Sequence, residues 1–237
     1  MDERVKKILD RSKSVVFFGG AGVSTESNIP DFRSESGLYS AMSEYGYAPE
    51  EMLSHTFFMK KMDIFYDYYR KNLLYPDAEP NKAHKALAKL EEEGKLIGIV
   101  TQNIDGLHQK AGNKLVYELH GSVHRNYCMD CHAFYDLQFI IDSEGIPRCP
   151  KCGGVVKPDV VLYEEGLDDN TIMKSINAIE KCDTLIIGGT SLAVYPAASF
   201  VQYFRGDNII LINKGETPYD SNADLVIHEA IGEVLGD

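Results

Sequence analysis

Residues 15–22 read VVFFGGAG, which is four consecutive apolar side chains followed by a turn of glycines and alanine. A run so short, stopped by glycines, is typical of a strand that is buried on both faces of a parallel sheet. Similar apolar runs follow along the chain, and helical patterns over residues 82–93 and 169–181 separate several of them. Those runs lie at residues 96–100, 115–119, 184–187, 209–212 and 225–227. The alternation predicts an α/β fold, with a doubly wound, Rossmann-like parallel sheet.

Polar residues and glycines follow the predicted strands. The segments concerned are Gly19–Thr25, Thr101–Asp105, His120, Gly188–Ser191 and Asn213-Lys214. Ligands of doubly wound sheets bind beyond the carboxyl ends of the strands. We therefore expect the functional site at the edge of the sheet where these segments meet.

Two stretches do not fit the pattern of the sheet. Residues 36–79 have a helical pattern rich in Tyr, Phe and Met, and residues 121–157 hold four of the five cysteines. We expect both to be insertions that together form a smaller domain, made of a helical insertion and a four-cysteine zinc module. The larger domain, which contains the predicted sheet, would then comprise residues 1–35, 80–120 and 158–237.

The formal net charge of this chain of 237 residues is −12. Phosphate binding needs a basic surface, so the charge argues against a nucleic-acid partner. Residues 1–13 are charged and amphipathic, unlike a signal peptide, and no apolar stretch approaches the ~20 residues that a membrane span needs. We expect a cytoplasmic monomer with no membrane partner. In a reducing compartment, cysteines serve metal binding or chemistry before disulfides.

The cysteines form two Cys-x-x-Cys pairs, Cys128 with Cys131 and Cys149 with Cys152, separated by residues 132–148. Two such knuckles complete a tetrahedral zinc site, and four protein ligands leave no open position for catalysis. The spacing therefore predicts one structural Zn²⁺. A nucleic-acid-binding ribbon is disfavoured, because the charges of residues 121–157 cancel.

The glycine turn and one histidine are the next candidates. Backbone amides of Gly20-Ala21-Gly22 could approach a pyrophosphate closely, but Thr25 stands where a dinucleotide fingerprint has its third glycine. This turn alone is equally compatible with a plain connection between a strand and a helix. His120 ends the run 115–119, so its ring should project over the edge of the sheet as a base near neutral pH. His108, His124 and His132 have no such argument.

Six segments, in order along the chain, match the signature motifs of one family. They are Gly20–Arg33, Thr101–His108, Leu119–Gly121, the four-cysteine module, Lys157–Val161 and Gly188–Leu192. On these motifs, which run from about Val15 to the last strand, the chain resembles the sirtuins, and among them the small bacterial type.

The resemblance implies roles for individual residues. His120 would be the catalytic base, and the four cysteines would hold the zinc. The NAD-binding residues would be Gly20, Ala21, Thr25, Asp31, Phe32, Arg33, Gln102, Asn103, Ile104, Asp105, Thr190, Ser191, Asn213, Lys214 and Ala230. The substrate lysine and its peptide would contact Val160, Tyr163, Gly189 and Leu192.

The resemblance also implies an activity. Sirtuins use NAD to remove acetyl groups from lysine side chains of proteins, giving nicotinamide and O-acetyl-ADP-ribose. Acylated-lysine proteins or peptides would be the partners. Two alternatives stay open: another acyl chain or ADP-ribosyl transfer on the same fold, and a protein that senses NAD or scaffolds zinc without catalysis.

The chain departs from the family pattern in a few places. Asn28 and Ser34 stand where glycine is usual, and Tyr163-Glu164-Glu165 stands where Phe-Gly-Glu is common. Sirtuins that prefer acidic acyl groups share a Tyr-x-x-Arg pair on the helix after the cofactor loop. Alignment puts Tyr66 and Tyr69 at these two positions and leaves Arg70 one residue beyond, about 100° round a helix. The resemblance therefore implies a preference for acetyl over succinyl groups.

Overall fold

A sheet of six parallel strands forms the centre of the computed structural model, which describes residues 1–31 and 42–236. The strand order is β3-β2-β1-β7-β8-β9. The strands are β1 (Val15–Gly19), β2 (Leu96–Thr101), β3 (Val116–Glu118), β7 (Thr184–Gly188), β8 (Asn208–Ile212) and β9 (Leu225–Ile227). All six predicted strands are present, each within one residue of its predicted ends.

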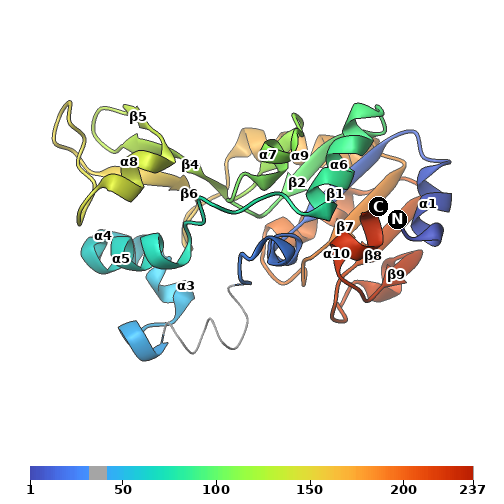
Figure 1. Ribbon diagram of the computed structural model, residues 1–237, viewed down its shortest axis with the longest axis horizontal. Coiled ribbons are helices and arrows are strands. Elements are labelled where there is room, and N and C mark those ends of the chain that lie inside the picture. The colour runs from blue at the N-terminus through green and yellow to red at the C-terminus, as the bar shows by residue number, and fades with distance from the viewer. Residues whose placement is uncertain (32–41, 237) are drawn as a thin grey trace.

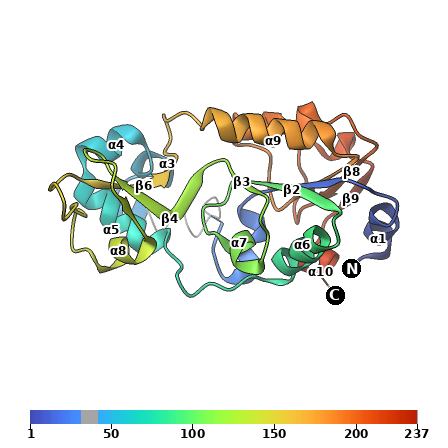
Figure 2. The same cartoon turned by 90° about the horizontal axis from the view of Figure 1, so that it is seen from above.

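Helices cover both faces of this sheet, as Figure 2 shows. Val15 and Phe17 of β1 pack in one core with α1 (Glu3–Leu9), α6 (Lys82–Glu92) and α10 (Ile231–Leu235). Val16 and Phe18 point the other way, into a core with α9 (Asp169–Lys181) and the 3-10 helix η3 (Ala197–Tyr203). The doubly wound fold predicted from the sequence is confirmed. No helix in the described part of the chain is long and apolar enough to cross a membrane.

The remaining elements form a second, smaller assembly beside the sheet (Figure 1). Its three-stranded antiparallel sheet has the order β5-β4-β6. Phe58, Phe65 and Tyr66 of the helical insertion share one core with Ile140 and Val156 of the cysteine module. The elements are α3 (Pro49–Met52), α4 (His55–Lys60), α5 (Met62–Asn72), β4 (Gly121–Cys128), β5 (Phe134–Tyr135), α8 (Leu137–Asp142) and β6 (Val156–Val160).

Short elements occupy the connections. The first two follow β1 directly, so 3-10 turns stand where a Rossmann fold commonly has a long helix. These elements are η1 (Ala21–Val23), η2 (Thr25–Ser27), α7 (Leu107–Ala111) and η4 (Asp220–Asn222).

The chain passes from the large sheet to the small one through two residues, Leu119 and His120. Strand β3 ends at Glu118 and β4 begins at Gly121. Gly121 has a φ of 76°, and a Cβ there would lie 1.9 Å from the carbonyl oxygen of Asp159. Only glycine fits such a position, because a side chain would meet both left-handed strain and a backbone clash. The connection that carries His120 is therefore pressed against β6.

Two buried histidines lie on α6 and α7. The rings of His84 and His108 lie 4.7 Å apart between centroids, and His84 Nδ1 accepts a hydrogen bond from the backbone N–H of Asn81 at 3.3 Å. Burial lowers the pKa of His84 to about 4 and holds the pKa of His108 well below its ordinary value. Both rings are therefore neutral at pH 7 in the folded protein.

We expect acid to weaken the fold through these histidines. The unfolded chain would protonate near pH 6.5 and the folded chain only near pH 4, so stability is lost as the pH falls through this window. The free energy of unfolding should be about 1–2 kcal/mol lower at pH 5 than at pH 7 because of His84. Urea unfolding of His84→Gln, which keeps a hydrogen-bond acceptor, should show a flatter pH dependence. An unchanged slope in His84→Gln would contradict the assignment of this pH dependence to His84.

Candidate functional site

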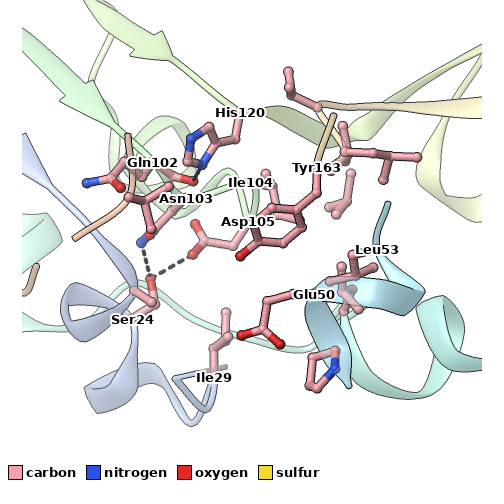
Figure 3. Close-up of a pocket in the computed structure, with 18 of the residues that line it drawn as sticks. Ser24, Ile29, Glu50, Leu53, Gln102, Asn103, Ile104, Asp105, His120 and Tyr163 are labelled. Carbon is pink, nitrogen blue, oxygen red and sulfur yellow. Dashed lines mark hydrogen bonds between the residues drawn. The ribbon is translucent and has the colours of Figure 1, made fainter. Parts of the chain in front are cut away.

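A cavity of about 280 Å³ lies at the carboxyl ends of the parallel strands, bordered on its other side by the smaller assembly (Figure 3). Three of the five strand-end segments predicted to meet contribute residues to this cavity, whereas Gly188–Ser191 and Asn213-Lys214 do not line it. Nine predicted site residues line it: Ala21, Asp31, Gln102, Asn103, Ile104, Asp105, His120, Val160 and Tyr163.

His120 faces the cavity with its ring in a defined state. Its Nδ1 lies 3.0 Å from the carbonyl oxygen of Gln102. A carbonyl oxygen can only accept, so Nδ1 carries the hydrogen and the neutral ring keeps its lone pair on Nε2. This arrangement suits a general base, because the hydrogen bond at Nδ1 selects the tautomer whose proton acceptor is Nε2.

Three polar side chains beside His120 form one hydrogen-bonded row (Figure 3). Asn103 Nδ2 donates to Ser24 Oγ at 3.0 Å, and Ser24 Oγ donates to Asp105 Oδ2 at 2.6 Å. The other carboxylate oxygen, Oδ1, accepts from the backbone N–H of Leu107 at 2.9 Å. These contacts fix the orientation of the Asp105 carboxylate at the wall of the cavity. Ser24 lies within the first motif, but no pattern in the sequence marks it as a site residue.

The loops after β1, β2 and β7 are bound to one another. The N–H of Gly22 donates to the carbonyl of Gly189 at 2.8 Å, and a Cβ on Gly22 would lie 2.8 Å from Gly189 Cα. Gln102 Nε2 donates to Thr190 Oγ1 at 3.2 Å. Thr25 Oγ1 donates back to the carbonyl of Gly22 at 3.0 Å. The glycine turn is thus held close to the end of β7, with a backbone approach that side chains would prevent.

The other predicted NAD and substrate residues do not line this cavity. Asn213 and Lys214 follow β8, and Ala230 caps the N-terminus of α10, so all three lie further along the same edge of the sheet. Gly20, Thr25, Gly189, Thr190, Ser191 and Leu192 lie on the loops after β1 and β7. Phe32 and Arg33 lie outside the described residues.

Tyr163 and Glu164 form the wall on the side of the helical insertion. The backbone N–H of Tyr163 donates to Leu53 O at 3.0 Å, and that of His55 donates to Tyr163 O at 2.9 Å. Glu164 has a φ of 76°, the conformation that the usual glycine adopts readily, and accepts from the N–H of Thr56 at 2.8 Å. Asn28, the other described departure, also has a positive φ, of 61°. Both departures keep the backbone conformation that glycine favours.

The four paired cysteines meet on the module furthest from the large sheet. Their sulfur atoms all lie within 4.8 Å of one another. Cys128 and Cys149 are buried, whereas Cys131 and Cys152 are exposed. Tyr135 Oη lies 3.0 Å from Cys149 Sγ. Four thiols at this separation fit a closed tetrahedral zinc site, and His124 and His132 are not needed as ligands.

A family model agrees with this geometry. The model of the Sir2 family matches residues 20–196, which include the glycine turn, the Asn103–Asp105 loop, His120 and the four cysteines. The chain belongs to the Sir2 family. Membership accounts for the presence of all these features in one chain and in this order.

Proteins similar to this Sir2 chain match it over nearly its whole length. A protein of Clostridium acetobutylicum named NAD-dependent protein deacetylase is 64% identical over 232 residues, covering 98% of this chain and 95% of its own. A solved Sir2 homologue in complex with NAD has a TM-score of 0.88 and 38% identity, covering 99% of this chain and 91% of its own. A Sir2 structure holding an inhibitor, 2′-O-acetyl-ADP-ribose and a deacetylated p53 peptide has a TM-score of 0.84 and 33% identity, covering 98% and 95% of the two chains.

We expect zinc removal to disorder the cysteine module of this Sir2 chain. Metal binding supplies folding free energy to small modules, so a chelator should raise hydrogen exchange in residues 121–157 and abolish turnover. Cys131→Ser should lower the zinc content in the same way. Cys182→Ala is the matched control, because Cys182 is buried beside Ile179 and belongs to no metal cluster in the described residues. A metal-free protein with native exchange rates and full activity would show that the zinc is dispensable.

Proposed function

We propose that this protein uses NAD to remove acetyl groups from lysine side chains of proteins, releasing nicotinamide and O-acetyl-ADP-ribose. The observation that carries the proposal is the pairing of His120 Nδ1 with Gln102 O beside the Asn103–Ser24–Asp105 row, in one cavity at the strand ends. The deacetylase name of the clostridial relative, and the NAD and acetyl-ADP-ribose bound by related structures, support it.

NAD supplies the ribose carbon that the acyl oxygen attacks as nicotinamide leaves. The residues of this chain position the two reactants and move one proton. His120 Nε2 would take a proton from a ribose hydroxyl, so that this oxygen adds to the acyl carbon. Addition of water and breakage of the bond between the acyl carbon and the lysine nitrogen would then free the amine and leave the acetyl group on the ribose. Orientation of this kind can lower the barrier substantially, and exclusion of water protects the reacting carbon.

The remaining proposed roles follow the order of the sheet edge. The Asn103–Ser24–Asp105 row holds the nicotinamide half, with Asp105 accepting from the carboxamide and Gln102 beside the ribose. The turn Gly20–Thr25 binds the diphosphate, with Asp31 as a further cofactor contact. On the family motif alone, Arg33 is assigned to the diphosphate and Phe32, with Ile104, to the nicotinamide pocket. Thr190, Ser191, Asn213, Lys214 and Ala230 hold the adenosine half. Val160, Tyr163, Gly189 and Leu192 contact the substrate peptide.

Replacement of His120 tests this function. His120→Ala should bind NAD with an affinity close to wild type, yet lose at least ~100-fold in kcat, because a general base contributes about that factor. Nicotinamide release that depends on an acetylated peptide is the measurement, and calorimetry with NAD is the control for folding. Near-normal turnover in the variant would exclude His120 as the base. Absence of peptide-dependent release in the wild type would favour a protein that only senses NAD.

The acyl pocket is proposed to accept short neutral groups. Tyr66 donates its hydroxyl to Val156 O at 2.6 Å, and Tyr69 is fully buried, so both belong to the core of the smaller assembly. Arg70 does not line the cavity. Its Nε donates to Ile140 O at 3.0 Å and its Nη2 to Gly145 O at 2.7 Å. No lysine or arginine lines the cavity in the described residues, so a bound acyl carboxylate would lack a partner there.

We therefore expect kcat/KM for an acetyl peptide to exceed that for the matched succinyl peptide by at least ~100-fold, because an unpaired buried carboxylate is costly. Mass spectrometry of both peptides with NAD gives the ratio. Arg70→Gln should leave it unchanged. Equal kcat/KM values on the two peptides would contradict the proposed neutral pocket. If the activity on the succinyl peptide were then lost in Arg70→Gln, Arg70 would be placed in the pocket.

The wider setting is proposed on the same basis. The NAD-binding domain comprises residues 1–35, 80–120 and 158–237, and the small domain residues 36–79 and 121–157. The shared core of the helical insertion and the cysteine module supports this division. The protein acts in the cytoplasm as a monomer, with no nucleic-acid partner, and the net charge of −12 supports the last point.

A further inference from the structure

One arginine joins the two sheets next to His120. Arg125 Nη1 donates to Glu118 Oε2 at 2.6 Å, and Arg125 Nε donates to Asp159 Oδ2 at 2.7 Å. Glu118 is the last residue of β3 in the large sheet, and Asp159 belongs to β6 in the small sheet. The guanidinium therefore joins Glu118, at the start of the connection that carries His120, to β6, the strand that pairs with β4 at the end of that connection.

The backbone around Arg125 is irregular in a way that makes this bridge possible. Strands β4 and β6 pair regularly, except for a register shift between Ser122 and Asn126. Within this bulge, Val123 N donates to Ile104 O at 3.0 Å, and His124 Nε2 lies 3.0 Å from Asp105 O. The first two residues of the bulge thus contact the Ile104–Asp105 loop, and the third, Arg125, contacts the two carboxylates. Bulges commonly re-aim side chains next to active sites.

Burial makes the contact with Glu118 important. The side chain of Glu118 is only 8% exposed, against 38% for Arg125 and 43% for Asp159. A buried carboxylate that loses its partner is strongly destabilised and would move to reach water. Movement at Glu118 would be transmitted directly, because only Leu119 separates it from His120.

Asp159 extends the bridge to the substrate side. It precedes Val160, which lines the cavity, and its carbonyl oxygen lies against Gly121. The backbone N–H of Val161 donates to His120 O at 3.0 Å. One guanidinium therefore contacts two carboxylates, of which one lies two residues before His120 and the other directly precedes Val160 of the cavity wall.

We propose that Arg125 is a positioning residue, which holds His120 in register between the NAD side and the substrate wall by bridging Glu118 and Asp159. The proposal rests on the deacetylase function proposed above. Arg125 touches neither reactant in this scheme. Its replacement therefore affects kcat and the KM for the peptide more than the Kd for NAD.

The experiment compares Arg125→Gln with Arg125→Lys and with Arg4→Gln. The control Arg4 also pairs with a carboxylate through two nitrogens, at Asp2, but lies exposed on α1. Arg125→Gln should lower kcat by about 10- to 100-fold, as expected for a misplacement near 1 Å, while Kd for NAD changes less than about 2-fold. Arg125→Lys should recover part of the rate, because it keeps the charge, and Arg4→Gln should match wild type.

Two isosteric variants test the two arms of the bridge. Glu118→Gln should lower kcat, and Asp159→Asn should chiefly raise KM for the peptide. The double variant Arg125→Gln/Glu118→Gln should lose no more rate than the worse single variant, because both remove the same contact. Wild-type kcat in Arg125→Gln, or independent additive losses in the double variant, would overturn the proposal.

A readout that needs no turnover separates this proposal from the proposed function. In Arg125→Gln, hydrogen exchange should rise in residues 117–125 and 158–162 but not in α1 or α9. An inactive wild type would refute the deacetylase function and leave this test intact. Unchanged exchange in both segments would refute the bridge, whatever the activity. If Arg125→Gln fails to fold, Glu118→Gln and Asp159→Asn carry the same comparison.

Discussion

The pairing of β1 with both β2 and β7 is the constraint on which the rest of the structure depends. It places the run Val15–Phe18 at the centre of the sheet, where each face must be covered. It also brings the ends of three parallel strands to one edge, at Gly19, Thr101 and Gly188. Because the strands that end at Gly19 and Gly188 continue into glycine-rich loops with little side-chain bulk, backbone and short polar groups can approach a ligand there. The cavity beside His120 is a consequence of this convergence.

Much of this could be predicted from local sequence. Continuous apolar runs fix the six strands, since both faces of a parallel sheet are buried. The two Cys-x-x-Cys pairs specify their own geometry, and the sulfur atoms do meet within 4.8 Å. The family motifs then supplied candidate roles that no periodicity could give. The motifs supplied the lining residues at the strand ends, Ala21, Gln102–Asp105 and His120, whereas residues of the helical insertion and those after β6 form the other wall of the cavity.

The features that sequence did not predict depend on contacts between distant segments. The register shift between Ser122 and Asn126 has no local signature, because it arises where β4 must contact β6 and the Ile104–Asp105 loop together. Ser24 acquires a role only because Asn103 and Asp105 lie on either side of its hydroxyl. His84 and His108 looked ordinary along the chain, and their low pKa values follow from burial that two separate helices create.

The departures from the family pattern show which property of a motif the fold requires. At Glu164 and Asn28 the residue differs from the usual glycine, yet the backbone stays in the left-handed region, with φ values of 76° and 61°. Asparagine visits that region more readily than most residues. Glutamate does not, but its carboxylate accepts from the N–H of Thr56 at the start of α4. Hydrogen bonds with the side chain and then the backbone of Thr56 lower the pKa of Glu164. An interaction that glycine cannot make thus opposes the strain that glycine would avoid. The wall beside Tyr163 therefore depends on the shape of the backbone at this turn, and more than one residue can supply that shape.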